Sequence, residues 1–234
     1  MYISVAAAQA PQGPATVQSP DALYADRANL ASAQRAAALW AVDFAQNPRS
    51  EAAAWKLARA YYWLGTHAPE TERRPLLEKG VDAGQKASAI APGRPEGHFW
   101  TAANMGALAE SYGMRQGLKY RRPIKDELET VLRIDRGFEH GSADRALGRW
   151  FFKVPRLFGG SHAESERHLK ASLEYDPDGT ASHFFLAELY LDDGRRADAR
   201  VELQKVVDAR GYPDWKAEDD EFKDRARKML AGLK

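Results

Sequence analysis

Apolar and small residues recur every third or fourth position through most of the chain, and no window shows the alternation of period two that β-strands require. The first spacing is typical of amphipathic α-helices, so the sequence predicts an all-α protein. Proline, glycine and capping residues divide the chain into about nine or ten helices. We expect helices over residues 20–46, 50–64, 69–90, 95–110, 114–134, 142–154, 163–173, 180–191, 196–209 and 215–234.

A second, longer pattern is a helical run that closes on a turn, in most cases with a proline. These runs end at Pro48, Pro92, Arg136 and Pro177, so the ends are 44, 44 and 41 residues apart. A constant period of about 20–50 residues is typical of stacked helical repeats. Proteins of this kind act by presenting a surface to a partner, so catalysis would need motifs of its own.

The best-formed unit is the run Leu186–Tyr190, with small and apolar residues downstream at Ala199 and Leu203. This unit resembles a tetratricopeptide repeat, in which small residues let two antiparallel helices approach closely. The observed period exceeds the about 34 residues of a standard repeat, and we expect the excess in residues 66–74 and 111–122. The fold class that follows is a tetratricopeptide-like solenoid of antiparallel helix pairs.

Composition and charge exclude several kinds of site. The chain has 34 basic and 33 acidic residues, which gives no electrostatic case for a nucleic-acid partner. It contains no cysteine, so disulfides, thiolate metal sites and thiol nucleophiles are excluded. No stretch approaches the about 20 apolar residues of a transmembrane helix, and we expect no membrane-spanning segment.

Motifs for catalysis, metals and cofactors are absent as well. The phosphate-binding, nucleophile-elbow and dinucleotide-binding glycine patterns do not occur. His162 and Glu166 lie four residues apart, but the six histidines form no metal-ligand set. The short basic cluster at residues 119–125 is typical of a solvated helix face. We therefore predict a protein that is not an enzyme and that needs no cofactor and no metal.

The first 18 residues differ from the rest of the chain. Residues 1–8 are small and apolar, and residues 11–20 are rich in proline, glutamine, glycine and serine. The A-x-A form of residues 8–10 is that of a signal-peptidase site, although the basic part and most of the apolar part of a signal peptide are missing. Residues 1–18 are thus a signal-peptide remnant or a disordered N-terminus, and residues 19–234 form a single helical-repeat domain. The first interpretation predicts a periplasmic protein and the second a cytoplasmic one.

A longer motif lies in the middle of the chain. It consists of Asn104 and Gly106, the run Asp144–Pro155 and the loop Gly159–Ser161. This series resembles the T-component family of TRAP transporters, which are periplasmic helical-repeat proteins that pair with a solute-binding protein. The resemblance implies a non-enzymatic accessory protein that binds a solute-binding protein, a small hydrophobic or carboxylate ligand, or both. It also implies that copies of the chain can form homo-oligomers.

Another set of residues, Trp55, Leu57–Ala60 and Glu218–Asp220, is similar to the regulator-of-microtubule-dynamics family. That family shares the helical-repeat architecture, so this resemblance implies a fold and no particular chemistry. The alternative function that stays open is a cytosolic tetratricopeptide adaptor that binds the peptide tail of a partner protein.

In tetratricopeptide arrays the first helix of each unit lines the concave groove, and nine residues of this chain fall at such positions. Aromatic rings there supply apolar contact area, and arginines can grip a carboxylate through two hydrogen bonds. Arg145 and Arg149 lie four residues apart and share one helix face, which suits an organic acid. The alternative is that they pair with Glu188 or another internal acid. The candidate groove residues are Trp55, Arg59, Tyr62, Phe99, Arg145, Arg149, Phe152, Phe184 and Glu188.

The loop at residues 155–160 is the second candidate contact. It places Leu157 and Phe158 between a proline and two glycines, which suggests an apolar tip that touches a partner or a membrane. The alternative is a loop that folds back and buries both side chains, with the glycines at positive φ.

Overall fold

The computed structural model describes residues 18–233, which fold into helices joined by short turns. This part of the chain contains no strand and eleven α-helices, one or two more than the sequence predicts. The signal-peptidase motif at residues 8–10 lies outside the described residues. The elements are α1 (Pro20–Ala25), α2 (Leu30–Gln46), α3 (Glu51–His67), α4 (Glu70–Ile90), α5 (Pro95–Ser111), α6 (Gly113–Ile134), α7 (Phe138–Lys153), the 3₁₀ turn η1 (Arg156–Phe158), α8 (His162–Leu173), α9 (Thr180–Asp192), α10 (Arg196–Asp208), the 3₁₀ turn η2 (Pro213–Trp215) and α11 (Lys216–Gly232).

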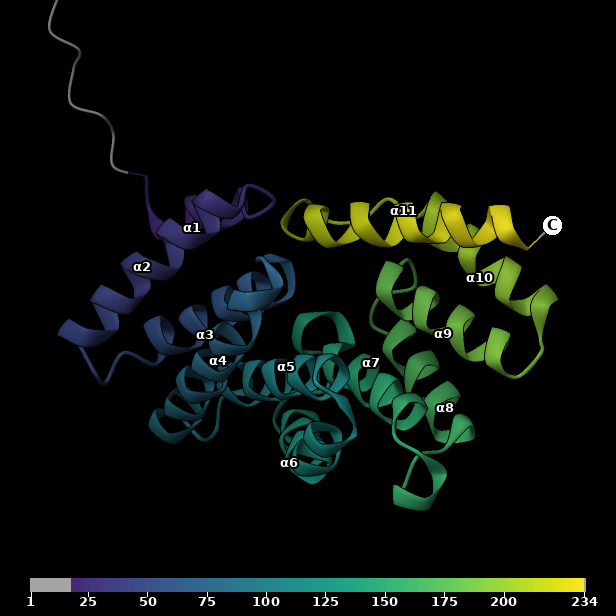
Figure 1. Ribbon diagram of the computed structural model, residues 1–234, viewed down its shortest axis with the longest axis horizontal. Helices are drawn as coiled ribbons and strands as arrows, with labels where there is room; N and C mark the ends of the chain where they lie inside the picture. Colours follow the sequence, from purple (N-terminus) through teal and green to yellow (C-terminus); the bar gives the residue numbers. More distant parts are fainter. Residues whose placement is uncertain (1–17, 234) are drawn as a thin grey trace, which may run out of the picture.

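Successive helices pack against one another as antiparallel pairs and build a curved array (Figure 1). α3, α5, α7 and α9 form the inner side of the curve, and α4, α6 and α8 lie behind them. α11 does not extend the array but crosses its inner side, and its first turn comes close to α1. The two ends of the array are thereby brought together across its concave face.

The single helix predicted over residues 20–46 is divided in the structure, so this prediction was wrong. α1 ends early, and a turn leads to Asn29, which caps α2. The Asn29 side chain accepts a hydrogen bond from the backbone N–H of Ala31 (3.1 Å), and Asp26 accepts one from the Ser32 hydroxyl (2.7 Å). The Asn29 side chain thus satisfies a free amide at a new N-terminus, and both local contacts compete with a continuous helix.

One further boundary differs from the predicted one. Gly65 lies within α3 and does not end it, because a Cβ there would come within 2.5 Å of the Leu77 side chain on α4. The glycine therefore permits close helix packing. Pro123 lies within α6 without dividing it. The buried side chains of Ile124 and Leu128 anchor that helix in the core, so tertiary packing outweighs the local preference of proline.

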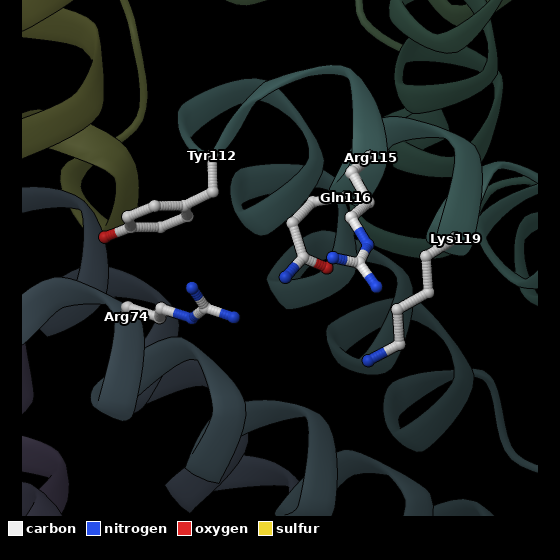
Figure 2. Close-up of a pocket in the computed structure, with 5 residues that line it drawn as sticks. All are labelled: Arg74, Tyr112, Arg115, Gln116 and Lys119. Atoms are coloured by element: carbon white, nitrogen blue, oxygen red, sulfur yellow. The ribbon is translucent and has the colours of Figure 1, made fainter.

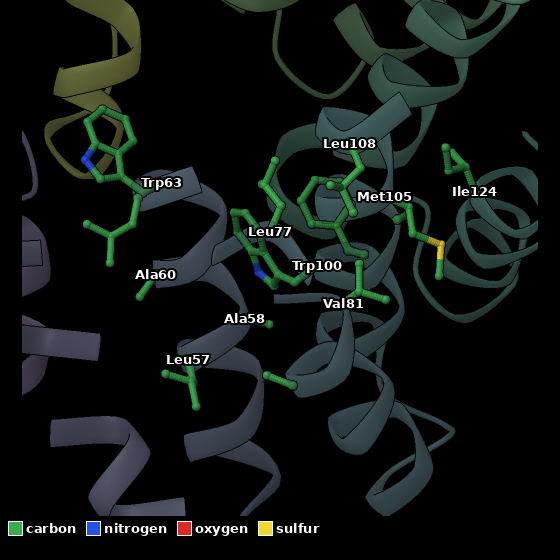
Figure 3. Close-up of a cluster of buried hydrophobic side chains, with 14 of the residues drawn as sticks. Leu57, Ala58, Ala60, Trp63, Leu77, Val81, Trp100, Met105, Leu108 and Ile124 are labelled. Carbon is green, nitrogen blue, oxygen red and sulfur yellow. The ribbon is translucent and has the colours of Figure 1, made fainter. Parts of the chain in front are cut away.

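The buried side chain of Asn104 ties three helices together. Its amide nitrogen donates to the backbone carbonyls of Ala58 on α3 (3.0 Å) and Trp100 within α5 (2.8 Å). On α4, a Cβ at Gly80 would lie 2.0 Å from Asn104 Oδ1, so only glycine leaves room for the amide. Asn104 thus fixes the spacing of α3, α4 and α5 in the apolar core that Figure 3 shows.

Buried apolar side chains form two clusters, one running from α1 through α7 and a smaller one joining α8 to α11. The two clusters meet where α7 crosses α8, because a Cβ at Gly148 would lie 2.5 Å from the Leu169 side chain. In the described part of the chain, no helix is both long enough and apolar enough to span a membrane.

Candidate functional site

All nine residues predicted for the groove belong to the inner helices α3, α5, α7 and α9. The groove itself is not open, because α11 lies across it (Figure 1). Phe184 of α9 is 1% exposed, and its ring packs against Phe222 of α11 with the centroids 5.3 Å apart. Arg225 of α11 lies 4.2 Å from the centroid of the same ring. The chain's own C-terminal helix therefore occupies this end of the concave face.

Arg149 is paired inside the protein. Its guanidinium donates to Glu110 (3.0 Å) and to Glu188, and it lies 4.7 Å from the centroid of the Phe185 ring. Burial by itself would lower the pKa of Arg149, but the hydrogen bonds and charges of the two carboxylates raise it overall. Arg149 therefore pairs with internal acids, as the alternative prediction from the sequence states, and its charge is neutralised within the array.

Arg145 differs from Arg149, although both lie on α7. Burial lowers the pKa of Arg145, and the neighbouring Glu139 and Asp176 act on it through their charges alone. Within residues 18–233, no hydrogen bond therefore fixes its guanidinium to either acid. Of the two arginines predicted to grip an organic acid, only Arg145 has no hydrogen bond to an acid in the described part of the chain.

The remaining aromatic residues of the predicted groove pack against the protein itself. Tyr62 lies 5.7 Å from Trp100 between ring centroids, and burial raises the pKa of its hydroxyl to about 12. Phe99 packs edge-on against Trp100 (5.1 Å) and Phe138 (5.6 Å). Phe152 is half-buried on α7. These rings contribute to the core more than to an open surface.

A set of polar contacts, which we call the clasp, fastens η2 and α11 to the first helices. Buried Arg27 forms an ion pair with Glu218 and donates to the backbone carbonyl of Asp214 (2.5 Å). His67 lies 2.8 Å from Glu221 of α11. Burial by itself would lower the pKa of His67, but the hydrogen bonds to Glu221 and to the Trp63 carbonyl, together with the nearby carboxylate charges, outweigh burial and raise the pKa. The clasp joins residues from opposite ends of the chain and closes the array.

Beneath the clasp lies a cavity of about 210 Å³, which we call the chamber, with walls from α1, α3, α5, α7, η2 and α11. Three of its lining residues carry a buried polar atom without a hydrogen-bond partner among the described residues: Arg59 Nε, Trp100 Nε1 and Glu139 Oε2. The Arg59 guanidinium rests 4.2 Å from the ring centroid of Tyr24 and 4.9 Å from that of Trp55. Buried polar groups are normally paired, so these three atoms mark the chamber as a candidate site.

The backbone is strained where it supplies Glu139 to the chamber. Glu139 (φ 41°) and His140 (φ 59°) adopt the left-handed conformation, which Gly141 continues (φ 74°). Within residues 18–233, Glu139 and His140 are the only residues other than glycine at positive φ. Such strain persists where the surrounding structure holds it, often at binding sites. Burial raises the pKa of Glu139 to about 7, although the charges of Arg59 and Arg145 oppose that shift.

A second site, the basic hollow, lies between the start of α4 and the turn from α5 into α6 (Figure 2). It measures about 610 Å³ and is lined by Arg74, Tyr112, Arg115, Gln116 and Lys119. The buried Gln116 Oε1 has no partner among the described residues, and Arg74 lies 5.6 Å from the Tyr112 ring centroid. Three cations with no acid among the lining residues favour an anionic ligand.

A model of the family described as regulator of microtubule dynamics protein 1-3 matches residues 17–158. The chain belongs to this family. A tetratricopeptide-repeat model matches residues 159–217, and such repeats are typically binding modules without catalytic activity. The resemblance based on Trp55 and Leu57–Ala60 is thereby confirmed, whereas Glu218–Asp220 lie beyond both matched ranges.

Among solved structures, a thermophilic tetratricopeptide-repeat protein from Thermus thermophilus is similar over 91% of the present chain and 97% of its own. The two chains share 21% sequence identity with a TM-score of 0.69, a likeness that shows the fold alone. No curated protein matches the chain in sequence. The all-α, tetratricopeptide-like fold that the sequence predicts is confirmed for this member of the microtubule-dynamics regulator family.

The predicted contact loop is exposed in this family member. Leu157 is 86% exposed, whereas Phe158 is half-buried beside Arg121, whose guanidinium lies 5.4 Å from the ring centroid. Gly159 follows at φ 104°, a conformation that favours glycine. The loop therefore presents one apolar side chain to solvent and folds the other back.

His162, Asp192 and Asp193 are close enough to hold a metal ion. However, both aspartates are exposed to solvent, and His162 Nδ1 already lies 2.6 Å from Asp193. An ordinary ion pair explains this geometry, and the group adds nothing to the candidate sites.

The two sites combine predicted residues with residues that the sequence did not single out. The chamber contains Arg59, a predicted groove residue, but Trp100 and Glu139 were not predicted. The basic hollow contains Lys119, which the sequence places in a solvated cluster, together with the distant Arg74. The one sequence feature that could have indicated the closure is α11 itself, because a helix beyond the last pair has to bury its apolar side on something.

Proposed function

We propose that this protein is a non-catalytic helical-repeat protein that binds an acidic segment of a protein partner at the basic hollow. The observation that carries the proposal is the set of three cations, Arg74, Arg115 and Lys119, with no acid among the lining residues. Membership of a family built from tetratricopeptide-type helix pairs supports a binding role.

The concave groove, where repeat arrays usually receive peptides, is less suited to that role here. A peptide in the groove would have to displace α11, and with it the Arg27–Glu218 ion pair and the contact of Phe184 with Phe222. No residue of α11 lines the basic hollow, so a ligand there requires no such displacement. Binding at the hollow therefore leaves the closed array intact.

The lining side chains suit an extended peptide with carboxylate side chains. Arg115 and Lys119 lie four residues apart on one face of α6, and Arg74 faces them from α4 (Figure 2). An arginine can hold a carboxylate through two hydrogen bonds. The cations are exposed to solvent, so we expect added salt to weaken the interaction.

A direct test is fluorescence anisotropy with a labelled oligoglutamate peptide, beside oligolysine and neutral peptides of equal length. We expect the double variant Arg115→Glu/Lys119→Glu to weaken oligoglutamate binding by about tenfold or more, because two attractions become repulsions. The control is Arg122→Glu, which changes an exposed arginine of α6 that does not line the hollow. Equal affinity of the wild type and the double variant would contradict the proposal.

The exposed side chain of Leu157 favours a second, narrower candidate. It lies in the stretch Arg145–Gly160 that resembles the T-component of TRAP transporters, and we propose that it contacts a periplasmic solute-binding protein. The cytosolic alternative is an adaptor that binds the peptide tail of a partner, and such an adaptor would bind that tail at the basic hollow and not at Leu157.

Pull-down of purified solute-binding proteins with Leu157→Ser separates these candidates. Val201→Ser is a matched control, because Val201 is 55% exposed and lies far from the loop on α10. Recovery that is lost with Leu157→Ser alone supports the narrower candidate. Equal recovery with the wild type and both variants would count against it.

A further inference from the structure

We infer that the chamber beneath the clasp is a binding site for a free α-amino acid. The chamber and the basic hollow share no lining residue, so this inference does not rest on the acidic-peptide site. It rests on the charge, the burial and the unused hydrogen-bonding atoms of the residues that surround the chamber.

The chamber separates two opposite charges that do not pair directly. Arg59 and Glu139 both line it, yet each acts on the other through its charge alone, without a hydrogen bond. A molecule with a carboxylate at one end and an ammonium group at the other satisfies both. Its carboxylate can accept hydrogen bonds from the Arg59 guanidinium, and its ammonium group can donate to the Glu139 carboxylate.

The unused hydrogen-bonding atoms are concentrated at the chamber. Of the six buried side-chain atoms without a partner in residues 18–233, three belong to residues that line it. Trp100 is only 3% exposed, so its indole N–H cannot turn to bulk solvent. The other three are Glu51 Oε1, Asn104 Oδ1 and Gln116 Oε1, which are separated from one another along the chain.

The balance of charge favours a zwitterion over a simple anion or cation. Arg27 and Glu218 also line the chamber, but they neutralise each other in the clasp. The remaining charged groups are the cation of Arg59 and the acids Glu139 and Asp214, with Arg145 next to Glu139. Cations and acids are thus about equal in number, and a ligand without net charge disturbs that balance least.

The size and the walls of the chamber indicate how large the ligand is and what kind of side chain it carries. A volume of about 210 Å³ leaves room for one amino acid. The rings of Tyr24, Trp100 and Trp215 line the same space. Aromatic walls favour an apolar side chain on the bound amino acid.

The experiment is a thermal-shift screen of the purified full-length protein with each of the common free amino acids, followed by calorimetric titration of those that bind. We expect at least one apolar amino acid to raise the melting temperature in a concentration-dependent way. Lactate and acetate serve as probes that lack the ammonium group. Binding of these acids without any amino acid, or no shift with any probe, would overturn the inference.

Matched variants locate the binding at the chamber. We expect Glu139→Gln and Arg59→Met each to weaken the affinity by about tenfold or more, because each removes a charge-assisted hydrogen bond. Arg225→Met is the control, since Arg225 lies on the concave side without lining the chamber. Glu139→Gln preserves shape, so it remains informative even if Arg59→Met does not fold. Unchanged affinity in Glu139→Gln would overturn the assignment.

Hydrogen exchange provides a readout that reports the site directly. The ligand would contact η2 and α11, so we expect slower amide exchange over residues 213–232 when the amino acid is bound. Residues 113–122, which belong to the basic hollow side of α6, should show no change. Protection at residues 113–122 with none at 213–232 would place the ligand elsewhere and contradict the inference.

Discussion

The clasp and the basic hollow use arginine in opposite ways. Arg27 of the clasp is 4% exposed and is held by Glu218 and by a backbone carbonyl, so its charge is spent on closing the array. Arg74 of the basic hollow has a side chain that is 49% exposed, and it shares a surface pair with Glu78. Burial strengthens charge interactions and also raises the cost of breaking them. Changes at the clasp should therefore affect stability, and changes at the hollow should affect binding.

The largest effect is expected for Arg27→Ala. The substitution removes the ion pair with Glu218 and the hydrogen bond to the Asp214 carbonyl, and it leaves a partly buried carboxylate without its partner. We expect the free energy of unfolding to fall by about 3 kcal/mol, measured by urea denaturation. A loss below about 1 kcal/mol would show that the clasp does not hold α11 in place.

The next effect concerns Glu139 and depends on pH. Its pKa is about 7 in the folded protein, above the about 4.3 of an unfolded glutamate, so the folded state binds the proton more tightly. The corresponding stability is complete below about pH 4 and is lost as the pH rises through 7. Glu139→Gln removes this loss.

We expect the Glu139→Gln variant to match the wild type near pH 4 and to be more stable by about 1–2 kcal/mol at pH 8, after partial exposure is discounted. Urea denaturation of dialysed protein at the two pH values measures the difference. A stability difference between the variant and the wild type that is the same at both pH values would mean that folding does not raise the pKa of Glu139 above that of an unfolded glutamate.

The parts of the fold that the sequence predicts depend on local contacts. Ser50 and Ser161 cap α3 and α8 by accepting hydrogen bonds from the backbone N–H groups of Ala53 and Glu164 (both 3.2 Å). Glu164 does not return a hydrogen bond to the cap residue, because the Ser161 N–H donates to the Phe151 carbonyl. Caps of this kind act within a few residues, so helix boundaries follow closely from the sequence.

The closure of the groove could not be predicted in the same way. Arg27 and Glu218 are 191 residues apart, and nothing in either neighbourhood indicates that they meet. The partner of Arg149 was foreseeable as one alternative, since the repeat geometry places Glu188 on the adjacent inner helix. The position of Glu139 in the chamber requires a left-handed backbone, which a glutamate does not favour locally. Tertiary packing therefore determines the backbone conformation of Glu139. This residue is one of the two opposite charges of the chamber, so its position could not be predicted from the local sequence.

A smaller effect is expected at the second contact of the clasp. The His67 pKa is raised in the folded protein, so the stability from its pair with Glu221 is complete below the unfolded pKa of about 6.5 and is lost as the pH rises through the folded value. Because Glu221 is half exposed, we expect Glu221→Gln to cost about 0.5–1 kcal/mol at pH 6 and less at pH 9. A cost that grows with pH would contradict this assignment.

The smallest effect on stability is expected for Arg74→Ala in the basic hollow. Arg74 forms an exposed pair with Glu78 on the same helix (3.0 Å), and such pairs contribute about 0.3–0.5 kcal/mol. We therefore expect unfolding by urea to change by less than about 0.5 kcal/mol, while oligoglutamate binding becomes measurably weaker. Arg27→Ala should show the reverse, with lower stability and unchanged peptide affinity below its unfolding transition. If both substitutions lowered stability equally, the difference in burial between the two arginines would not determine their roles.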